Sequence, residues 1–465
     1  MRIGFDGSCL SNRRGFGRFS RLLLESLARR PGKHRLVVVI DRPSEPAVTI
    51  PEGCDRVVVD VGDAPSAAAS AQGRRRFGDM LAMGRAVARA GLDLMYFPAT
   101  YTFFPVWNVP RLVVTMHDTL ALAHPDLVFP TRGGRLAWLL KEHAAARMSD
   151  RIVTVSETSR RDLQAWFRLP ANRLRVITEG PDSIFRPEAE SPRAETVLRQ
   201  LAIPSGARYL LYVGGLSPHK NLPRLIEAFS RIKATNLLLV VVGDFKDVFH
   251  THVAEIQSAI ASAGLKDQVL LPGFVPDAEL VYLYSRAYAL VQPSLMEGFG
   301  LPAVEAMACG TPVLSSRAGS LPEVVGDAGL FFDPTDVASM AATINQALAD
   351  TRLRDDLACR ALDRAGLFTW DRAAQSLLEC FSDLDRSSRG RWPRNAHVEV
   401  MSRKKSVGRE SELATDESRA SREAERCVIA SSTHPTGSYV RRLRLGRAVI
   451  NRDCGLLTGL EGNTN

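Results

Sequence analysis

The stretch PSLMEGFGLPAVEAMACGTP, residues 293–312, combines residue types that could bind a phosphorylated sugar. Glu297 and Glu305 lie eight residues apart, and the glycine-rich segment 298–300 follows the first of them. The N–H groups of such a segment and the N-terminus of a following helix form an anion site. Carboxylates beside it accept hydrogen bonds from sugar hydroxyls. The pattern predicts a site for a sugar joined to a phosphate; the alternative is an ordinary strand-to-helix turn with two solvated glutamates.

A strand and a short helix must position these carboxylates. The apolar run 288–291 predicts a buried strand before the turn. Leu301 and Pro302 predict the first turn of the helix, because proline is tolerated where the N–H is unpaired in any case. Gly310 predicts the end of the helix.

Two other segments place candidate ligand contacts next to predicted strands. His117 and Asp118 follow the strand 112–116, and α/β folds bind ligands at the carboxyl ends of their strands. The alternative is a helix-capping aspartate beside a structural histidine. Gly15 and Gly17 belong to a GxGxxS segment, an incomplete dinucleotide fingerprint and weak evidence for NAD. That segment predicts either a loop that admits a ligand or a tight turn.

Strands and helices alternate twice along the chain. The first alternation ends near residue 183, and the second runs from the strand 209–213 to the helix 336–350. This rhythm predicts an α/β protein with two open, mostly parallel sheets that carry helices on both faces. We expect the strand ends of the two halves to face each other, with the ligand between them.

The composition argues against several classes of protein. Of the 465 residues, 45% are hydrophobic and 24% charged, which fits a soluble globular protein of two to three domains. We find no run of 18 apolar residues and no signal-peptide pattern, so we expect a cytoplasmic protein without a transmembrane helix. The seven cysteines are scattered, without a CxxC pair or metal-ligand spacing, which fits a reducing compartment.

Most of the net charge of +9 belongs to the C-terminal end. Residues 386–465 contain 16 Lys and Arg against 9 Asp and Glu, so the remainder carries only +2. A nearly neutral body argues against a general role in nucleic-acid binding. We expect 386–465 to be a disordered basic tail. The alternative is a basic arm that contacts a membrane or a nucleic acid.

The predicted helix 131–148 leaves two interpretations open. It carries Leu136, Leu139 and Leu140 on one side, with four Lys or Arg residues around them. Such a helix could contact an anionic membrane surface, here the inner face of the cell membrane. More often such a helix packs on the sheet with its charges in solvent.

In the order of its motifs, the chain resembles the retaining glycosyltransferases of family 4. The resemblance covers residues 1 to about 381, and its most specific element is the E-x7-E pattern of Glu297 and Glu305. The other matching segments are TMHD (115–118), VTVS (153–156), YVGG (212–215) with Lys220-Asn221, PGFV (272–275) and Trp370.

The resemblance implies the GT-B fold, in which two Rossmann-like domains face each other across a cleft. We place an acceptor-side domain at 1–183 and a nucleotide-sugar-binding domain at 184–369. A terminal helix, 370–385, should pack back toward the first domain.

The resemblance also implies roles for individual residues. Lys220 would bind the donor diphosphate, Glu297 would lie at the donor sugar, and Glu305 would hold the ribose hydroxyls. His117 would lie beside the donor sugar on the acceptor side, with Asp118 next to it. Further donor contacts are expected at Gly15, Gly17, Gly215, Val275, Gly298, Phe299, Gly300 and Leu301.

One position departs from the family pattern. Many relatives carry an arginine five residues before the lysine, and here that position is Gly215. Lys220 then supplies the side-chain charge at the diphosphate alone, unless Arg18 or another basic residue reaches it.

Glu297, His117 and Lys220 are the predicted catalytic residues, and we expect neither a metal nor another cofactor. The D-x-D sequence, Asp383 to Asp385, lies at the end of the last predicted helix and far from any strand end. We therefore reject it as a metal site.

The resemblance predicts transfer of a hexose from GDP-mannose or a UDP-sugar to a saccharide or lipid-linked acceptor. The product would be a cell-surface polysaccharide, a lipopolysaccharide or a glycolipid. One alternative is another GT-B enzyme, such as a sugar-nucleotide epimerase or a phosphorylase, which the E-x7-E pattern argues against. The other is a non-catalytic protein that binds sugar nucleotides, which the intact Lys220, Glu297 and Glu305 argue against.

Overall fold

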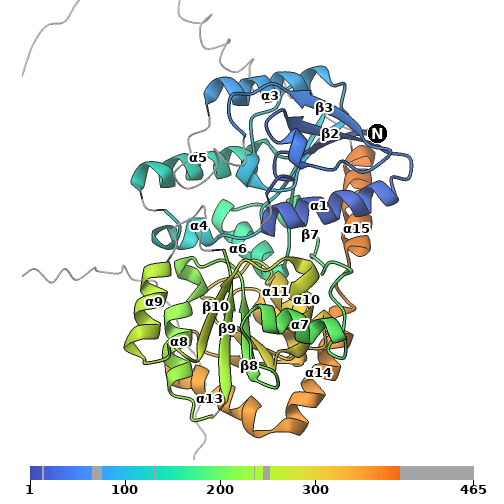
Figure 1. Ribbon diagram of the computed structural model, residues 1–465. Coiled ribbons are helices and arrows are strands. Elements are labelled where there is room, and N and C mark those ends of the chain that lie inside the picture. Colours follow the sequence, from blue (N-terminus) through green and yellow to red (C-terminus); the bar gives the residue numbers. More distant parts are fainter. Residues whose placement is uncertain (13–14, 65–75, 130, 235, 245–251, 388–465) are drawn as a thin grey trace, which may run out of the picture. The chain divides into compact units, whose positions relative to one another are not determined.

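A computed structural model describes residues 1–12, 15–64, 76–129, 131–234, 236–244 and 252–387 (Figure 1). One compact unit spans Met1–Trp392. It contains two separate β-sheets, each with its own helices. The predicted disordered tail lies almost entirely outside the described residues.

The first sheet has seven strands in the order β3-β2-β1-β4-β5-β6-β7, and all neighbouring strands are parallel. Its strands are β1 (Arg2–Asp6), β2 (Arg35–Asp41), β3 (Asp55–Val59), β4 (Leu94–Phe97), β5 (Arg111–Thr115), β6 (Arg151–Thr154) and β7 (Leu174–Val176). The helices of this half are α1 (Gly15–Arg29), α3 (Phe77–Arg89), α4 (Leu120–Ala123), α5 (Arg132–Met148) and α6 (Glu157–Phe167). Its short 3-10 turns are η1 (Glu45–Ala47), η2 (Thr100–Thr102), η3 (Pro125–Leu127) and η4 (Ala171–Arg173).

The second sheet has six parallel strands in the order β10-β9-β8-β11-β12-β13. Its strands are β8 (Arg208–Val213), β9 (Leu237–Val242), β10 (Val269–Gly273), β11 (Ala289–Gln292), β12 (Val313–Ser316) and β13 (Gly329–Phe332). The helices here are α7 (Pro192–Gln200), α8 (Leu222–Ser230), α9 (Val253–Ser262), α10 (Asp277–Arg286), α11 (Leu301–Ala308), α12 (Leu321–Val325), α13 (Val337–Ala349) and α14 (Thr351–Ala365). The last described helix is α15 (Trp370–Ser387). Two 3-10 turns, η5 (Pro218–Lys220) and η6 (Gly326–Ala328), complete this half.

Both sheets reverse their strand order at an inner strand. The reversal falls between β1 and β4 in the first sheet and between β8 and β11 in the second. Connections on the two sides of such a point leave in opposite directions, so a ligand binds outside the carboxyl ends of those strands. The topology therefore places candidate sites after β1 and β4 and after β8 and β11.

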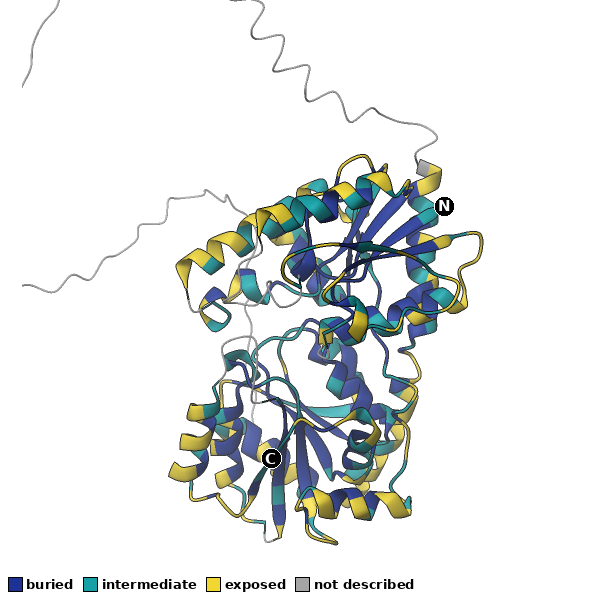
Figure 2. Ribbon diagram, turned by 45° about the horizontal axis from the view of Figure 1, so that its top comes forward, coloured by how far each residue is buried: buried dark blue, intermediate teal, exposed yellow. Residues whose placement is uncertain are grey.

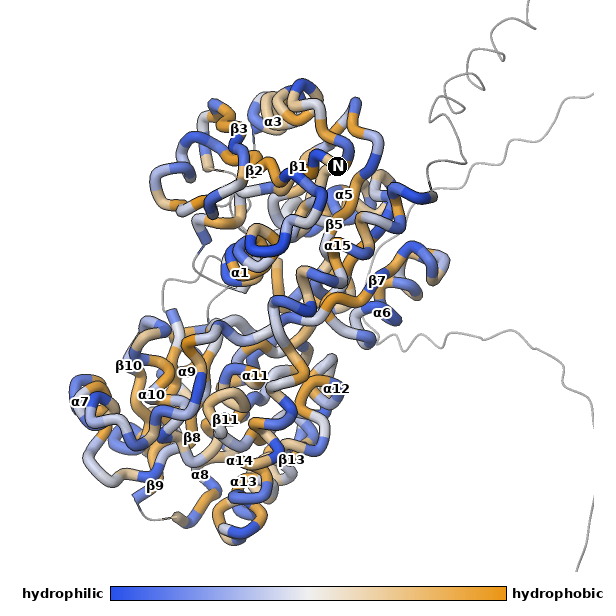
Figure 3. Tube along the Cα trace, turned by 90° about the vertical axis from the view of Figure 1, so that its right-hand side faces the viewer, coloured by the Kyte–Doolittle hydropathy of each residue, from blue (hydrophilic) through white to orange (hydrophobic). Residues whose placement is uncertain are grey.

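The strands form the centre of each half, and the helices cover them. Residues 37–40 of β2 are fully buried, as expected for a parallel strand covered on both faces. Figure 2 shows buried strands inside helices whose outer faces are exposed. Figure 3 shows apolar residues concentrated on strands such as β2, with mixed polarity along the helices. The predicted α/β fold with two parallel sheets is confirmed.

Helix α1 begins earlier than predicted. Gly15 and Gly17 belong to its first turn and not to a loop before it. A Cβ atom added at Gly17 would lie 1.7 Å from the carbonyl oxygen of Asn12. Glycine is therefore needed because the preceding segment packs directly on the helix, and the predicted loop at 15–17 is wrong.

The terminal helix α15 packs against α1. The hydroxyl of Ser26 donates to Asp371 at 2.7 Å, and the rings of Phe19 and Trp370 meet edge to face. The last helix therefore packs on the N-terminal half of the protein.

Among the described residues, no helix is both long enough and apolar enough to cross a membrane.

Candidate functional site

Glu297 lies in the turn between β11 and α11, and several groups fix it there. Its carbonyl oxygen accepts hydrogen bonds from the backbone N–H and the hydroxyl of Ser320, at 3.1 and 3.0 Å. Its Oε1 accepts from Lys220 Nζ at 2.6 Å, from Ser294 Oγ at 2.6 Å and from Gln292 Nε2 at 3.2 Å. Within the described residues, no group donates to its Oε2. One carboxylate oxygen is held in place, while the second is left for a further donor.

Lys220 reaches Glu297 because of the sheet topology. It ends η5, which follows β8, and Glu297 follows β11, the neighbour of β8. Burial raises the pKa of Glu297, but the charge of Lys220 and the hydrogen bonds from Lys220 and Ser294 act together against it, and the pKa lies below its usual value. Burial and the charge of Lys220 lower the pKa of His219 to about 3, so this ring is neutral. A localised ion pair therefore occupies the point where the second sheet reverses its order.

Glu305 lies inside α11 and is sealed from solvent, with a side chain that is 1% exposed. One oxygen pairs with the guanidinium of Arg18, and the other accepts from the hydroxyl of Tyr284 at 2.9 Å. Burial raises the pKa of Glu305 to about 7 even though Arg18 opposes this. Arg18 also pairs with Asp277, so its guanidinium joins α1 of the first half to two carboxylates of the second.

The glycine-rich turn brings the two halves into direct contact. A Cβ atom added at Gly298 would lie 2.6 Å from the carbonyl oxygen of His117. The hydroxyl of Ser159 donates to the carbonyl of Gly298 at 3.3 Å. Gly300 has a φ of 96° and caps α11, whose first turn contains Pro302 as predicted. Gly310 follows the helix with a φ of 75°, again as predicted.

The ring of His117 is held by acceptor groups at both nitrogens. Its Nε2 lies 3.0 Å from the carbonyl oxygen of Pro98, and its Nδ1 lies 3.4 Å from Oε1 of Glu179. A carbonyl accepts and does not donate, so Nε2 carries a proton. Its Nδ1 faces the Glu179 carboxylate, so the ring is oriented from both sides. The rings of Phe16 and Phe19 pack against it.

Asp118 has a local structural contact. Its Oδ1 accepts from the backbone N–H of Leu120 at 2.8 Å, at the start of α4. Burial raises the pKa of this carboxyl. Burial also raises the pKa of Glu142 in α5, whose carboxylate accepts from Thr100 Oγ1 at 2.6 Å.

The remaining predicted contacts differ in what they can offer a ligand. Val275 follows β10 and is buried, so only its backbone can border a base, whereas the neighbouring Phe274 is 57% exposed. The carbonyl of Gly215 accepts from the hydroxyl of Tyr212 at 2.5 Å. The segment 298–301 brings Phe299 and Leu301 into the core and leaves backbone groups at the turn.

Several members of the site were not predicted from the sequence. Gln292 and Ser294 lie at the carboxyl end of a buried strand, and this position could have marked them in the sequence as candidate site residues. Glu179 follows β7 in the same way. Tyr284 and Asp277 belong to α10, and no feature of the sequence around them points to the site.

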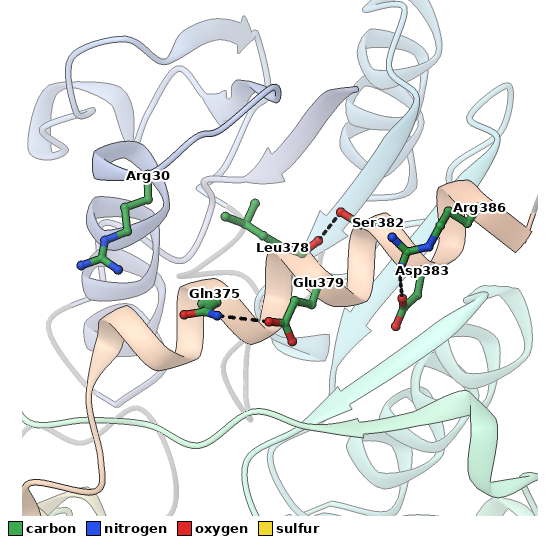
Figure 4. Close-up of a pocket in the computed structure, with 7 residues that line it drawn as sticks. All are labelled: Arg30, Gln375, Leu378, Glu379, Ser382, Asp383 and Arg386. Atoms are coloured by element: carbon green, nitrogen blue, oxygen red, sulfur yellow. Dashed lines mark hydrogen bonds and ion pairs between the residues drawn. The ribbon is translucent and has the colours of Figure 1, made fainter.

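Within the described residues, no group of three His, Cys, Asp or Glu side chains could hold a metal ion. Asp383 of the D-x-D sequence lies in α15 and pairs with Arg386 at 2.6 Å. It lines a hollow of about 600 Å³ on α15 and α1 (Figure 4). The residues around this hollow are Arg30, Gln375, Leu378, Glu379, Ser382, Asp383 and Arg386. None of the predicted site residues is among them.

Comparison with known proteins identifies the family. A model described as Glycosyltransferase Family 4 matches residues 13–183, and one described as Glycosyl transferases group 1 matches 194–364. The O-antigen chain mannosyltransferase B of Escherichia coli is 31% identical over 284 residues, 60% of this chain and 72% of that protein. The chain belongs to the family 4 (group 1) glycosyltransferases. The predicted family is therefore confirmed.

Solved structures of other glycosyltransferases share the fold of this family 4 member. Sucrose-phosphate synthase from Thermosynechococcus elongatus superposes with a TM-score of 0.66 at 21% identity, covering 83% of this chain and all of that chain. Anabaena Alr3699/HepE in complex with UDP-glucose gives a TM-score of 0.61 at 21% identity, with 82% and 100% covered. These similarities establish the GT-B fold.

Proposed function

We propose that this family 4 glycosyltransferase is a retaining enzyme that moves a hexose from a nucleoside-diphosphate sugar to a saccharide or lipid-linked acceptor. One observation carries the proposal. Lys220 pairs with Glu297 beside the N-terminus of α11, and His117 of the other half touches the same turn at Gly298. A cation, a carboxylate, a helix N-terminus and the acceptor-side half thus meet at one place.

The donor would occupy this place in a defined direction. Its diphosphate would lie at Lys220 and the backbone N–H groups of the turn, where a helix N-terminus favours negative charge. The donor sugar would take the open Oε2 of Glu297. The ribose hydroxyls would donate to Glu305, one turn into the helix.

The reaction breaks the bond between the anomeric carbon and the phosphate oxygen. The acceptor oxygen forms its bond to that carbon on the same face, and its proton passes to a phosphate oxygen of the leaving group. The leaving nucleoside diphosphate gains negative charge as the bond breaks. Lys220 and the N–H groups of the turn would stabilise this charge without a metal.

His117 would orient the sugar or the acceptor and would not act as a base. Both of its ring nitrogens face acceptor groups, Pro98 and Glu179. Because Nε2 donates to the Pro98 carbonyl, it has no free electron pair to receive a proton, and Nδ1 faces the carboxylate of Glu179.

The donor and the acceptor are inferred from relatives. The similarity to a mannosyltransferase of O-antigen chains favours GDP-mannose, and the shared fold with a UDP-glucose-bound protein favours a UDP-sugar. The acceptor would belong to the synthesis of a cell-surface polysaccharide, lipopolysaccharide or glycolipid.

We place the reaction in the cytoplasm, at the inner surface of the membrane. Leu136 and Leu140 of α5 are 59% and 64% exposed and lie one turn apart. Arg132 and Arg135 are exposed beside them. Apolar side chains flanked by basic ones suit the interface of an anionic membrane.

A nucleotide-sugar screen tests the proposal. GDP-mannose or a UDP-hexose should raise the melting temperature, because a ligand of the native state stabilises it. Incubation with saccharide and lipid-linked acceptors should then give a product whose anomeric configuration, read by NMR, equals that of the donor. Activity should persist in a chelator. An inverted product would contradict retention, and loss of activity in the chelator would contradict metal independence.

A further inference from the structure

We propose that Arg18 is the second cation of the donor site. It would leave Glu305 and bind the donor diphosphate when the nucleotide sugar enters. This inference rests on the proposed function and concerns a residue of the acceptor-side half.

The position of Arg18 in its own helix is unfavourable without partners from elsewhere. It lies in the first turn of α1, where the helix dipole disfavours a positive charge. Its partners, Glu305 and Asp277, both belong to the other half of the molecule. The guanidinium also lies over the ring of Phe185, 5.7 Å from its centre. The contacts that hold this charge in the site are therefore supplied by the second half.

Arg18 occupies the position that the ribose would need. Both oxygens of Glu305 are engaged, one by Arg18 and the other by Tyr284. Tyr284 is fully buried within the same half, so it cannot withdraw. Arg18 comes from the other half and its side chain is 18% exposed, so it is the partner that can yield to a hydroxyl.

The released guanidinium has a destination within reach. Glu305 lies four residues after Leu301, which is a rise of about 6 Å along the helix axis. A diphosphate at the N-terminus of α11 would therefore lie within the span of a turned arginine side chain.

The exchange replaces each contact that it breaks at the buried glutamate and at the cations. Without a donor, Lys220 pairs with Glu297, and Arg18 is shared by Glu305 and Asp277. A nucleotide sugar brings hydroxyls that donate to both site glutamates and two negative phosphates for both cations. The buried Glu305 therefore keeps hydrogen-bond donors on its oxygens, and Asp277, with a side chain that is 35% exposed, is left to solvent.

The test compares nucleoside diphosphates with nucleosides in Arg18→Gln. UDP, GDP, ADP and dTDP are titrated into wild type by calorimetry, and the best of them and its nucleoside are then titrated into the variant. Loss of a charge-assisted contact predicts about 10- to 100-fold weaker diphosphate binding. Nucleoside binding should stay equal or become tighter. Arg29→Gln, the same change on the exposed side of α1, should change neither affinity.

A second variant is expected to act in the opposite direction. Asp277→Asn removes one of the partners that hold Arg18 away from the diphosphate, so diphosphate affinity should rise by a few-fold. A residue with a purely structural role would not give this gain. Equal weakening of nucleoside and diphosphate in Arg18→Gln, or unchanged diphosphate affinity, would overturn the exchange. If wild type binds none of the four diphosphates, the proposed function itself fails.

Discussion

The two glutamates of the site are chemically alike but electrostatically different. Glu297 has Lys220 within 2.6 Å, and its pKa is held below the usual range. Glu305 is deeper, and burial raises its pKa to about 7 although Arg18 contacts it. Glu297 is therefore an anion at the proposed sugar position. The charge of Glu305 near neutral pH depends on whether Arg18 contacts it.

Glu305 should give the fold a measurable pH dependence. Its pKa is about 7 in the folded chain against 4.5 for the free group, so the native state holds the extra proton between these values. The stability contributed by this proton is fully present below pH 4.5 and is lost as the pH rises through 7. Glu305→Gln cannot titrate, so its stability relative to wild type should increase from pH 5 to pH 8, by at most about 3 kcal/mol.

Melting temperatures of wild type and Glu305→Gln across this pH range provide the measurement. Glu255→Gln, an exposed position on α9, serves as the matched control and should show no such trend. A difference between Glu305→Gln and wild type that does not change with pH would contradict the account.

At the residue scale, the spacing of Glu297 and Glu305 pointed to the turn after β11, and the family resemblance added Lys220. It did not find the pairing of Arg18 with Glu305, which are 287 residues apart. Only the packing of the two halves brings them together. Glu179 follows a predicted strand, which could have marked it as a candidate. Its contact with His117 could not be inferred from the sequence, because the two residues are far apart in the chain.

At the scale of elements, a helix of one half is capped by a side chain of the other. Glu323 of α12 accepts hydrogen bonds from the N–H groups of Glu157 and Thr158, at 2.7 and 2.9 Å. It also accepts from the hydroxyl of Thr158 at 2.9 Å. A carboxylate at a helix N-terminus satisfies free donors and suits the helix dipole. Ser156 caps the same helix from within its own half, where its hydroxyl accepts from the N–H of Ser159 at 3.0 Å.

Glu323→Ala should loosen the start of α6. Loss of these charged hydrogen bonds predicts a destabilisation of about 1–3 kcal/mol. Hydrogen exchange at the first turn of α6 should accelerate, and the melting temperature should fall. Glu255→Ala is the control on an exposed helix of the same half. Unchanged exchange at residues 157–159 would show that the cap contributes nothing.

The exposed leucines of α5 lead us to expect a membrane contact that can be measured directly. Replacing Leu136 and Leu140 by serine should weaken sedimentation with phosphatidylglycerol vesicles at least about tenfold, since each buried leucine contributes roughly 1.5–3 kcal/mol. The melting temperature should stay unchanged, because both side chains are exposed. Leu367→Ser, an exposed leucine of the other half, is the matched control. If the variant with both serines and Leu367→Ser bind the vesicles equally well, α5 has no role in membrane contact.

Strands with a continuous run of apolar residues were predicted correctly, whereas helices with few apolar residues were missed. The predicted strands 112–116 and 209–213 lie within one residue of the observed bounds of β5 and β8. Helices α7 and α14 were not predicted. In α14 only Leu357, Ala361 and Ala365 are buried, and charged residues separate them. Two alanines in a charged helix give too weak a periodicity to detect from sequence.

At the scale of the whole molecule, the function depends on two sheets with one topology. Each reverses its strand order at an inner strand. Arg18, Lys220 and Glu297 follow β1, β8 and β11, strands at those points, while His117 follows β5, the neighbour of β4. The alternation of strands and helices was enough to predict two parallel sheets. The strand order was not predictable from sequence, because it depends on long-range pairing such as β1 with β4.

The donor site at the turn after β11 is tested most directly by Glu297→Gln. The amide keeps the shape of the side chain but removes the charge that faces the donor sugar. We predict that transfer from the nucleotide sugar identified for wild type falls at least about 100-fold. The affinity for the nucleoside diphosphate and the melting temperature should stay close to wild type. Transfer at the wild-type rate by this variant would contradict the assignment of the site.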